Sequence, residues 1–137
     1  MDIIKNTEPT DQDIVEIRDN LRAFNRPFLE NIRNDQLAFY INDDSAVKVA
    51  GIAGRMRGNW LLVQYLWVSE PLKNQGLGSR LLKSLEDYAV EQGCHSVMLD
   101  TASFQAEPFY RKHGYKTEMT LEDNDFPTVF YMTKQLK

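Results

Sequence analysis

One stretch of this sequence limits its possible folds more than any other, because a strand, a glycine turn and a helix follow one another directly. The apolar run Trp60–Val68 is broken only by Gln64, and such a run is typical of a strand buried on both faces of a sheet. After it, Gly76 and Gly78 mark a tight turn, and apolar residues recur at helical spacing from Leu77 onward. The stretch therefore predicts a central strand that leads into an amphipathic helix.

Strands and helices alternate irregularly along the rest of the chain. Thr10 and Asp13 form a capping pair for a helix whose pattern breaks at Pro27, and a second short helix is expected over residues 28–33. Turn residues delimit further strands over residues 37–41, 47–57, 96–101, 115–121 and 128–136, and a further helix over residues 105–113. This order predicts an α/β fold with a mixed sheet and helices on both faces.

Length and composition are those of one soluble domain. The chain has 137 residues, of which 42% are hydrophobic, and no linker divides it, so residues 1–137 are expected to form a single domain. A net charge of −4 argues against a nucleic-acid partner. No apolar run reaches the length of a membrane span, and the N-terminal residues include Asp2 and Glu8 without the long apolar run of a signal peptide. These features predict a cytoplasmic protein without a membrane partner. The single cysteine, Cys94, excludes a multi-thiolate metal site and is expected to pack as a small apolar side chain.

The glycine turn has the chemistry of an anion-binding site. The first turn of a helix carries N–H groups without helical partners, and two glycines let a diphosphate approach the backbone. Lys73 adds a cation and Ser79 a hydroxyl. No Gly-Lys-Ser/Thr sequence follows, which excludes a Walker A loop, and the third glycine of a Rossmann fingerprint is missing. A tight turn without any ligand is the alternative interpretation of Gly76 and Gly78.

Two segments resemble the GNAT superfamily of acetyltransferases. Residues 73–79, Lys-Asn-Gln-Gly-Leu-Gly-Ser, are similar to motif A of that family, Arg/Gln-x-x-Gly-x-Gly/Ala, although Lys73 departs from the usual Arg or Gln. Residues 106–115 resemble the family's Ala-x-x-x-Tyr-x-x-x-Gly-Phe/Tyr segment, with Tyr110 at the tyrosine position. The order of elements and the length agree as well. The chain is therefore identified as a small single-domain member of this superfamily.

The resemblance implies a mostly antiparallel sheet in which one parallel pair of strands splays apart around acetyl-CoA. Those strands would be the one ending near Val68 and the one over residues 96–101. The residues that the resemblance implies for binding acetyl-CoA are Leu66, Val68, Lys73, Asn74, Gln75, Gly76, Leu77, Gly78, Ser79, Ser103 and Tyr110. Among them, Leu66 and Val68 would pair with the pantetheine arm, and the amides of residues 73–79 would hold the diphosphate. No metal is implied.

The resemblance also implies direct transfer of the acetyl group to a primary amine of a small molecule or a peptide. Tyr110 would protonate or hydrogen-bond the coenzyme's sulfur, although a tyrosine on an apolar helix face can equally be a packing residue. Family members that use a strand base carry it at the positions of Leu62 and Gln64, and neither residue accepts a proton here. No base is therefore predicted, with Tyr65 and Glu118 left as conceivable participants.

Two other functions fit the same motifs. One is a sensor or scaffold domain that binds coenzyme A without efficient chemistry, which the uncharged Leu62 and Gln64 would allow. The other is a nucleotide-binding domain that uses the same glycine turn. A homodimer is also expected, since the apolar residues 129–132 of the last strand could form a pairing edge.

Overall fold

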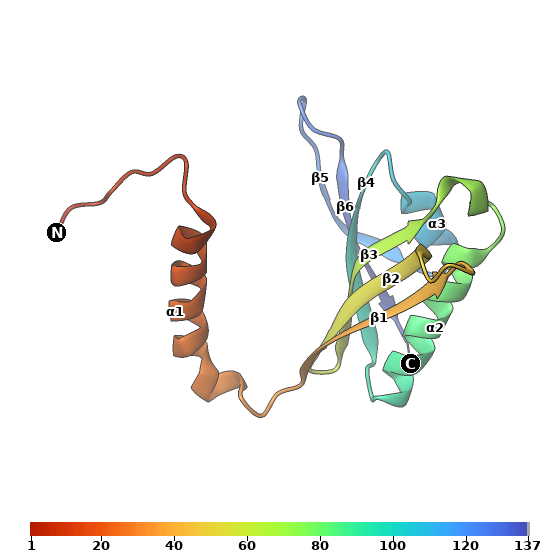
Figure 1. The fold of residues 1–137 in the computed structure, drawn as a ribbon, viewed down its shortest axis with the longest axis horizontal. Coiled ribbons are helices and arrows are strands. Elements are labelled where there is room, and N and C mark those ends of the chain that lie inside the picture. Colours follow the sequence, from red (N-terminus) through yellow and green to blue (C-terminus); the bar gives the residue numbers. More distant parts are fainter. Residues whose placement is uncertain (137) are drawn as a thin grey trace. The chain divides into compact units, whose positions relative to one another are not determined.

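The computed structural model describes residues 1–136, which fall into two compact units (Figure 1). The first unit, Met1–Ile32, contains α1 (Asp11–Leu29). The second unit begins at Arg33 and contains β1 (Asn34–Asn42), β2 (Lys48–Arg57), β3 (Trp60–Val68), the short 3-10 helix η1 (Glu70–Leu72), α2 (Leu77–Glu91), β4 (Ser96–Ala102), α3 (Glu107–Lys112), β5 (Lys116–Leu121) and β6 (Val129–Gln135). That residues 1–137 form a single domain stays a prediction.

The helix α1 begins with the expected capping box. The Thr10 hydroxyl accepts a hydrogen bond from the Asp13 N–H at 3.2 Å, and the Asp13 carboxylate accepts one from the Thr10 N–H at 2.9 Å. The helix continues through Pro27, so the predicted break and the separate helix over residues 28–33 are wrong. Because Pro27 lies in the last turn, it removes only one helical hydrogen bond. The Glu30 N–H still closes the turn on the carbonyl four residues earlier, at 2.9 Å.

The second unit is built on one six-stranded sheet with the strand order β1-β2-β3-β4-β6-β5. All neighbouring strands are antiparallel except β3 and β4, which confirms the predicted mixed sheet with one parallel pair. Strand β6 lies between β4 and β5, so the expectation that residues 129–132 form a pairing edge is wrong. The edges of the sheet are β1 and β5.

Both helices of the second unit pack into the same apolar core. From α2 the buried side chains are Leu81, Leu82, Leu85 and Ala89, and α3 contributes Tyr110. They meet alternate side chains of the central strands, including Ile52 of β2, Leu61 of β3 and Val97 of β4. Figure 1 shows α2 and α3 on one side of the strands, so this unit covers one face of its sheet with helices.

The lone cysteine belongs to this core. Cys94 is 2% exposed, and burial raises the pKa of its thiol against the opposing influence of Arg33. The Arg33 guanidinium lies 3.6 Å from the sulfur and donates to the carbonyl of Gly58 at 2.8 Å. Arg33 thereby ties the chain just before β1 to the turn between β2 and β3. The expectation that Cys94 packs as a small buried side chain is confirmed.

Candidate active site

Strands β3 and β4 pair at one end and separate at the other. Their ladder runs from the pair Trp60 and Ser96 to the pair Leu62 and Met98, and stops there. We call residues 60–62 and 96–98 the closed end of the pair, and residues 63–68 and 99–102 the open end. The splayed parallel pair that the sequence motifs implied is therefore present.

The separation coincides with a β-bulge on β3. Ala53 of β2 lies opposite Tyr65, whereas the next residue, Gly54, lies opposite Val63, so Gln64 is an extra residue without a partner on β2. A bulge of this kind bends a strand and turns its side chains, and bulges are frequent beside active sites. Gln64 therefore places the bulge at the start of the open end, one residue after Val63.

The bulge requires a glycine on the neighbouring strand. A Cβ atom added to Gly54 would lie 2.5 Å from the carbonyl oxygen of Leu62, a distance that real Cβ atoms do not adopt. Only a residue without a side chain lets the backbones of β2 and β3 approach this closely. Gly54 on β2 therefore permits the backbone geometry of the bulge on β3.

The bulge also reverses which residues of β3 face the core. Before it, Leu61 and Val63 are buried, and after it Leu66 and Val68 pack against the core, which is a change from odd to even positions. The prediction that β3 is buried on both faces is wrong, because Trp67 is 53% exposed. Apolar residues occur at odd positions before the bulge and at even positions after it because the alternation shifts there, and not because both faces of β3 are buried.

The backbone of the open end has unpaired amides. The Ser69 N–H donates to the carbonyl of Val49 on β2 at 2.9 Å, which fixes the direction of amides along this part of β3. Because hydrogen-bonding directions alternate in an antiparallel ladder, Trp67 also faces β2, and Leu66 and Val68 direct their amides toward the β4 side. No strand among the described residues pairs with them there. These are the two residues implied for pairing with the pantetheine arm.

A cavity of about 240 Å³ lies between the separated strands. It is lined by Val63, Gln64, Tyr65, Leu66 and Trp67 of β3, by Leu99, Asp100 and Thr101 of β4, and by Gln105, Ala106 and Tyr110 at α3. Two predicted site residues, Leu66 and Tyr110, thus meet in one cavity. A second cavity of about 390 Å³ shares the segment of β3 around Gln64 and also includes Asp100.

Tyr110 is held tightly in the wall of the first cavity. It is 6% exposed, and its ring lies edge-on to the rings of Phe109 and Tyr115, with centroids 5.2 and 5.5 Å away. Burial, and secondarily the charge of Asp100, raises the pKa of Tyr110 to about 12. Its hydroxyl therefore keeps its proton at neutral pH, and within residues 1–136 no group hydrogen-bonds to it. It is a hydrogen-bond donor available to a bound molecule.

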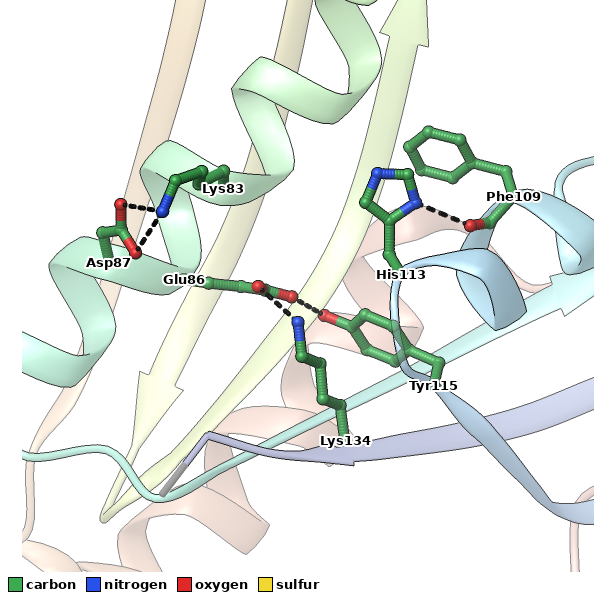
Figure 2. Close-up of polar contacts among 7 residues, drawn as sticks. All are labelled: Lys83, Glu86, Asp87, Phe109, His113, Tyr115 and Lys134. Carbon is green, nitrogen blue, oxygen red and sulfur yellow. Dashed lines mark hydrogen bonds and ion pairs between the residues drawn. The ribbon is translucent and has the colours of Figure 1, made fainter.

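A polar network of Tyr115, Glu86 and Lys134 begins at the Tyr115 ring that packs against Tyr110, and Figure 2 shows its contacts. The Tyr115 hydroxyl donates to Glu86 of α2 at 2.6 Å, and the Lys134 ammonium of β6 lies 2.8 Å from the other Glu86 oxygen. Glu86 is only 8% exposed, and burial together with this carboxylate raises the pKa of Tyr115. The Tyr115 N–H in turn donates to the Tyr110 carbonyl at 3.0 Å. The network therefore joins α2, β6 and the end of α3 at fixed distances.

The glycine turn before α2 has the backbone of an anion cradle. Asn74 and Gly76 have positive φ angles of 65° and 79°, and the first helical hydrogen bond runs from the Arg80 N–H to the Gly76 carbonyl at 3.1 Å. The three intervening amides therefore have no helical partner. Lys73 lies just before this turn, and its ammonium pairs with Glu70 at 3.0 Å.

The turn and the cavity adjoin each other. A Cβ atom at Gly78 would contact the Phe109 ring at 3.6 Å and the Val68 side chain at 4.0 Å, so the start of α2 lies against α3 and the end of β3. Figure 2 shows how Phe109 is itself held, since the His113 ring nitrogen donates to the Phe109 carbonyl at 2.8 Å. Ser103, by contrast, is exposed after β4, where its N–H donates to the Thr128 carbonyl at 2.7 Å, and it lines neither cavity.

Sequence reasoning missed three features of the site: the bulge at Gln64, the carboxylate of Asp100, and the anchoring of α3. Gln105 accepts a hydrogen bond from the Ala102 N–H at 2.7 Å, and the Thr101 hydroxyl accepts one from the Ala106 N–H at 3.3 Å. Alternation along residues 96–101 could have found Asp100, because it places this residue on the face opposite the buried Val97 and Leu99. The other two depend on contacts between elements and leave no local signal.

Within residues 1–136, no group of three or more His, Cys, Asp or Glu side chains is arranged to hold a metal ion. No helix in this part of the chain combines the length and the apolar composition needed to cross a membrane.

Three features of this site occur together: a splayed parallel strand pair, a glycine turn at the start of the following helix, and a tyrosine that lines the cavity. This combination is typical of one class of acyltransferases. Residues 5–115 match the family model described as the acetyltransferase (GNAT) family, and the chain belongs to this family. It is an N-acetyltransferase, as the two sequence motifs predicted.

Individual relatives agree with this assignment. The chain is 34% identical over 105 residues to blasticidin-S acetyltransferase from Streptomyces morookaense, which covers 75% of this chain and 77% of that protein. It is 35% identical over 100 residues to acetyltransferase Atu2258 from Agrobacterium fabrum (strain C58), covering 72% of each. The crystal structure of an acetyltransferase from Bacillus cereus matches with a TM-score of 0.82 and 29% identity, covering 98% of this chain and 97% of that one.

Proposed function

We propose that this protein uses acetyl-CoA to acetylate a primary amine of a small molecule by direct transfer. The observation that carries the proposal is the open end of β3, whose Leu66 and Val68 amides lack a strand partner beside the glycine cradle and Tyr110. The relative from Streptomyces morookaense is named for a small-molecule acceptor, blasticidin-S, which favours a small molecule over a peptide.

The residues present fit acetyl-CoA at two points. The unpaired amides at the start of α2 suit a diphosphate, since a helix N-terminus favours negative charge. Gly76 supports this fit, because its left-handed φ of 79° is the conformation in which glycine is favoured and no heavy atom lies within 4 Å of where its Cβ would be. The amides of Leu66 and Val68 suit the amide groups of the pantetheine arm. Asn74, Gln75, Leu77, Ser79 and Ser103 complete the proposed binding residues.

Acetyl-CoA supplies an activated acetyl thioester, and Tyr110 is placed to assist its cleavage. A tyrosine with a pKa of about 12 does not readily protonate a thiolate, because thiols ionise near about 8.5. Its hydroxyl can instead donate a hydrogen bond to the sulfur as negative charge develops there. We therefore assign Tyr110 as a hydrogen-bond donor to the departing sulfur, which keeps its own proton.

Lys73 contributes less to binding than its motif position suggests. Its ammonium is half-exposed and already paired with Glu70. A phosphate would have to share that ammonium with the carboxylate or displace it, and exposed ion pairs contribute little. The backbone of the cradle therefore provides most of the proposed recognition of the diphosphate. A cytoplasmic location and a homodimer stay predictions, and the homodimer has lost the strand edge that motivated it.

Titration calorimetry and a thiol-release assay test this function together. The purified chain is expected to bind acetyl-CoA, whereas ATP and NAD, which share the diphosphate but not the pantetheine arm, are expected to bind at least tenfold more weakly. Thiol release is then measured across a panel of primary amines. Uptake of acetyl-CoA without thiol release from any amine would favour a coenzyme-binding sensor instead. Absence of uptake would remove the proposal.

A further inference from the structure

The carboxylate of Asp100 stands where the two cavities meet. Both are lined by residues of the open end, and Val63, Gln64, Tyr65, Leu99 and Asp100 belong to each. The first cavity continues toward α3 and Tyr110, whereas the second is bounded by Leu62 and Met98. Asp100 is thus the one acidic residue among the described residues that line the two cavities, and it lines both of them.

Strand alternation assigns the side chains of β4 that line these cavities to opposite faces of the sheet. Leu99 and Thr101 are 2% and 4% exposed, because they face the core under the helices. Successive side chains of a strand point to opposite faces. Met98, which is 41% exposed, and Asp100 therefore lie on the face away from α2 and α3. The glycine cradle belongs to α2, so Asp100 presents its carboxylate on the face of the sheet opposite the helix that carries the cradle.

The charge of Asp100 has no counter-ion among the described residues. No Lys, Arg or His in residues 1–136 forms an ion pair or hydrogen bond with its carboxylate. The other side chains around the second cavity are apolar or uncharged amide and phenol groups. The effect of Asp100 on the pKa of Tyr110 indicates that its field extends into the first cavity as well. A carboxylate in such surroundings attracts a cation.

We propose that the second cavity is the acceptor subsite and that Asp100 binds an acceptor carrying positive charge, an alkylammonium ion. This proposal rests on the proposed acetyltransferase function and adds the class of its acceptor. The ammonium group must lose one proton to solvent before its nitrogen can attack the thioester carbon. The contribution of Asp100 is therefore to recognition and local concentration of the acceptor, and it acts mainly on KM.

The test compares Asp100→Asn with the wild type at saturating acetyl-CoA, using alkylamines and an uncharged arylamine as acceptors. We expect kcat/KM for alkylamines to fall about tenfold to a hundredfold, mainly through KM, as for the loss of one charge-assisted hydrogen bond. For the arylamine kcat/KM should change less than about twofold, and Asp100→Glu should recover part of the loss. Glu91→Gln, an exposed substitution on α2, is the matched control and should change neither.

Each outcome decides between the proposals. Equal loss for charged and uncharged acceptors, or no loss at all, overturns the role of Asp100. So does a wild-type protein that binds acetyl-CoA and prefers the arylamine to every alkylamine. Calorimetry on Asp100→Asn should give an unchanged Kd for acetyl-CoA, and a parallel loss of that binding also overturns the assignment. Failure of the wild type to bind acetyl-CoA removes the acetyl-CoA-dependent function itself.

Discussion

The closed and open ends of the β3–β4 pair use the same two strands for opposite purposes. At the closed end, three residues of each strand satisfy one another's backbone groups, and Leu61 and Val97 are fully buried. At the open end, the strands leave a cavity and two unpaired amides, and Tyr65 is 74% exposed. The closed end stabilises the fold through strand pairing, whereas the unpaired strands of the open end form the cavity of the site.

A β-bulge lies at the boundary between the two regions. Gln64 follows the last residue of β3 that pairs with β4, Leu62, by two positions, and Leu66, Val68, Asp100 and Tyr110 all lie beyond the paired segment. Substitutions at the closed end should therefore change stability and leave turnover intact. Substitutions at the open end should do the reverse. The predictions below test this division, from the largest expected change in free energy to the smallest.

The first prediction concerns Glu86, which supports the closed end. Its partner Lys134 lies on β6 opposite Val97 of the closed end. Glu86→Ala leaves a partly buried cation and a buried phenol without their acceptor, so the free energy of unfolding should fall by about 4 kcal/mol. Chemical denaturation measures this. Asp87→Ala is the control: Figure 2 shows Asp87 pairing with Lys83 on the exposed side of α2, and its loss should cost about 0.5 kcal/mol or less.

The second prediction concerns the boundary itself. Gly54→Ala places a Cβ atom against the Leu62 carbonyl and should lower the free energy of unfolding by about 3 kcal/mol, as overpacking does. Gly51→Ala on the same strand is the control, because its Cβ would meet the Tyr40 Cβ at 3.2 Å, where a small shift suffices. Because Gly54 also fixes the bulge, kcat/KM should fall with stability. A fully active, stable variant would contradict the role given to the bulge.

The third prediction concerns alkaline pH. The pKa of Tyr110 is about 12 in the folded protein and about 10 when unfolded, so the unfolded chain loses this proton first as pH rises. Stability from this group is complete below pH 10 and should decline by about 2 kcal/mol by pH 12. Tyr115 acts in the same direction, since its pKa is also raised. Denaturation at stepped pH checks this, and Tyr110→Phe should show a smaller decline.

The fourth prediction concerns turnover at the open end. Tyr110→Phe removes the proposed hydrogen bond to the sulfur and should lower kcat about tenfold, or about 1.4 kcal/mol, with an unchanged Kd for acetyl-CoA. Tyr88→Phe is the control, because Tyr88 packs on Phe39 of β1 and lines neither cavity. Steady-state thiol release measures both variants. An unaltered kcat in Tyr110→Phe would make this tyrosine a packing residue only.

Local patterns in the sequence were sufficient for most of the fold. Periodicity located the six strands and the helix from Leu77, and the motif residues predicted the splayed pair and the tyrosine that lines its cavity. These features depend on neighbours along the chain. The errors arose where a pattern had two physical explanations: Pro27 near the end of a helix resembles a break, and a shifted alternation in β3 resembles a strand buried on both faces.

The remaining features depend on contacts between distant segments. The bulge at Gln64 is defined by its register against β2, and its one trace in the sequence is Gly54 on another strand. The position of β6 inside the sheet depends on pairing between strands that are distant in the sequence. The sequence alone therefore did not exclude that residues 129–132 form an edge. Asp100 gains significance only because the strands around it separate.

The environment of Cys94 has a practical consequence for measuring the reaction. A thiol that is 2% exposed and has a raised pKa offers almost no thiolate to a disulfide reagent in the folded protein. Because this is the single cysteine of the chain, a chromogenic disulfide added to the assay would register coenzyme released by turnover and little else. Colour that develops in a sample without acetyl-CoA would then come from Cys94 and report unfolding of the enzyme, which gives each set of kinetic runs a measure of its integrity.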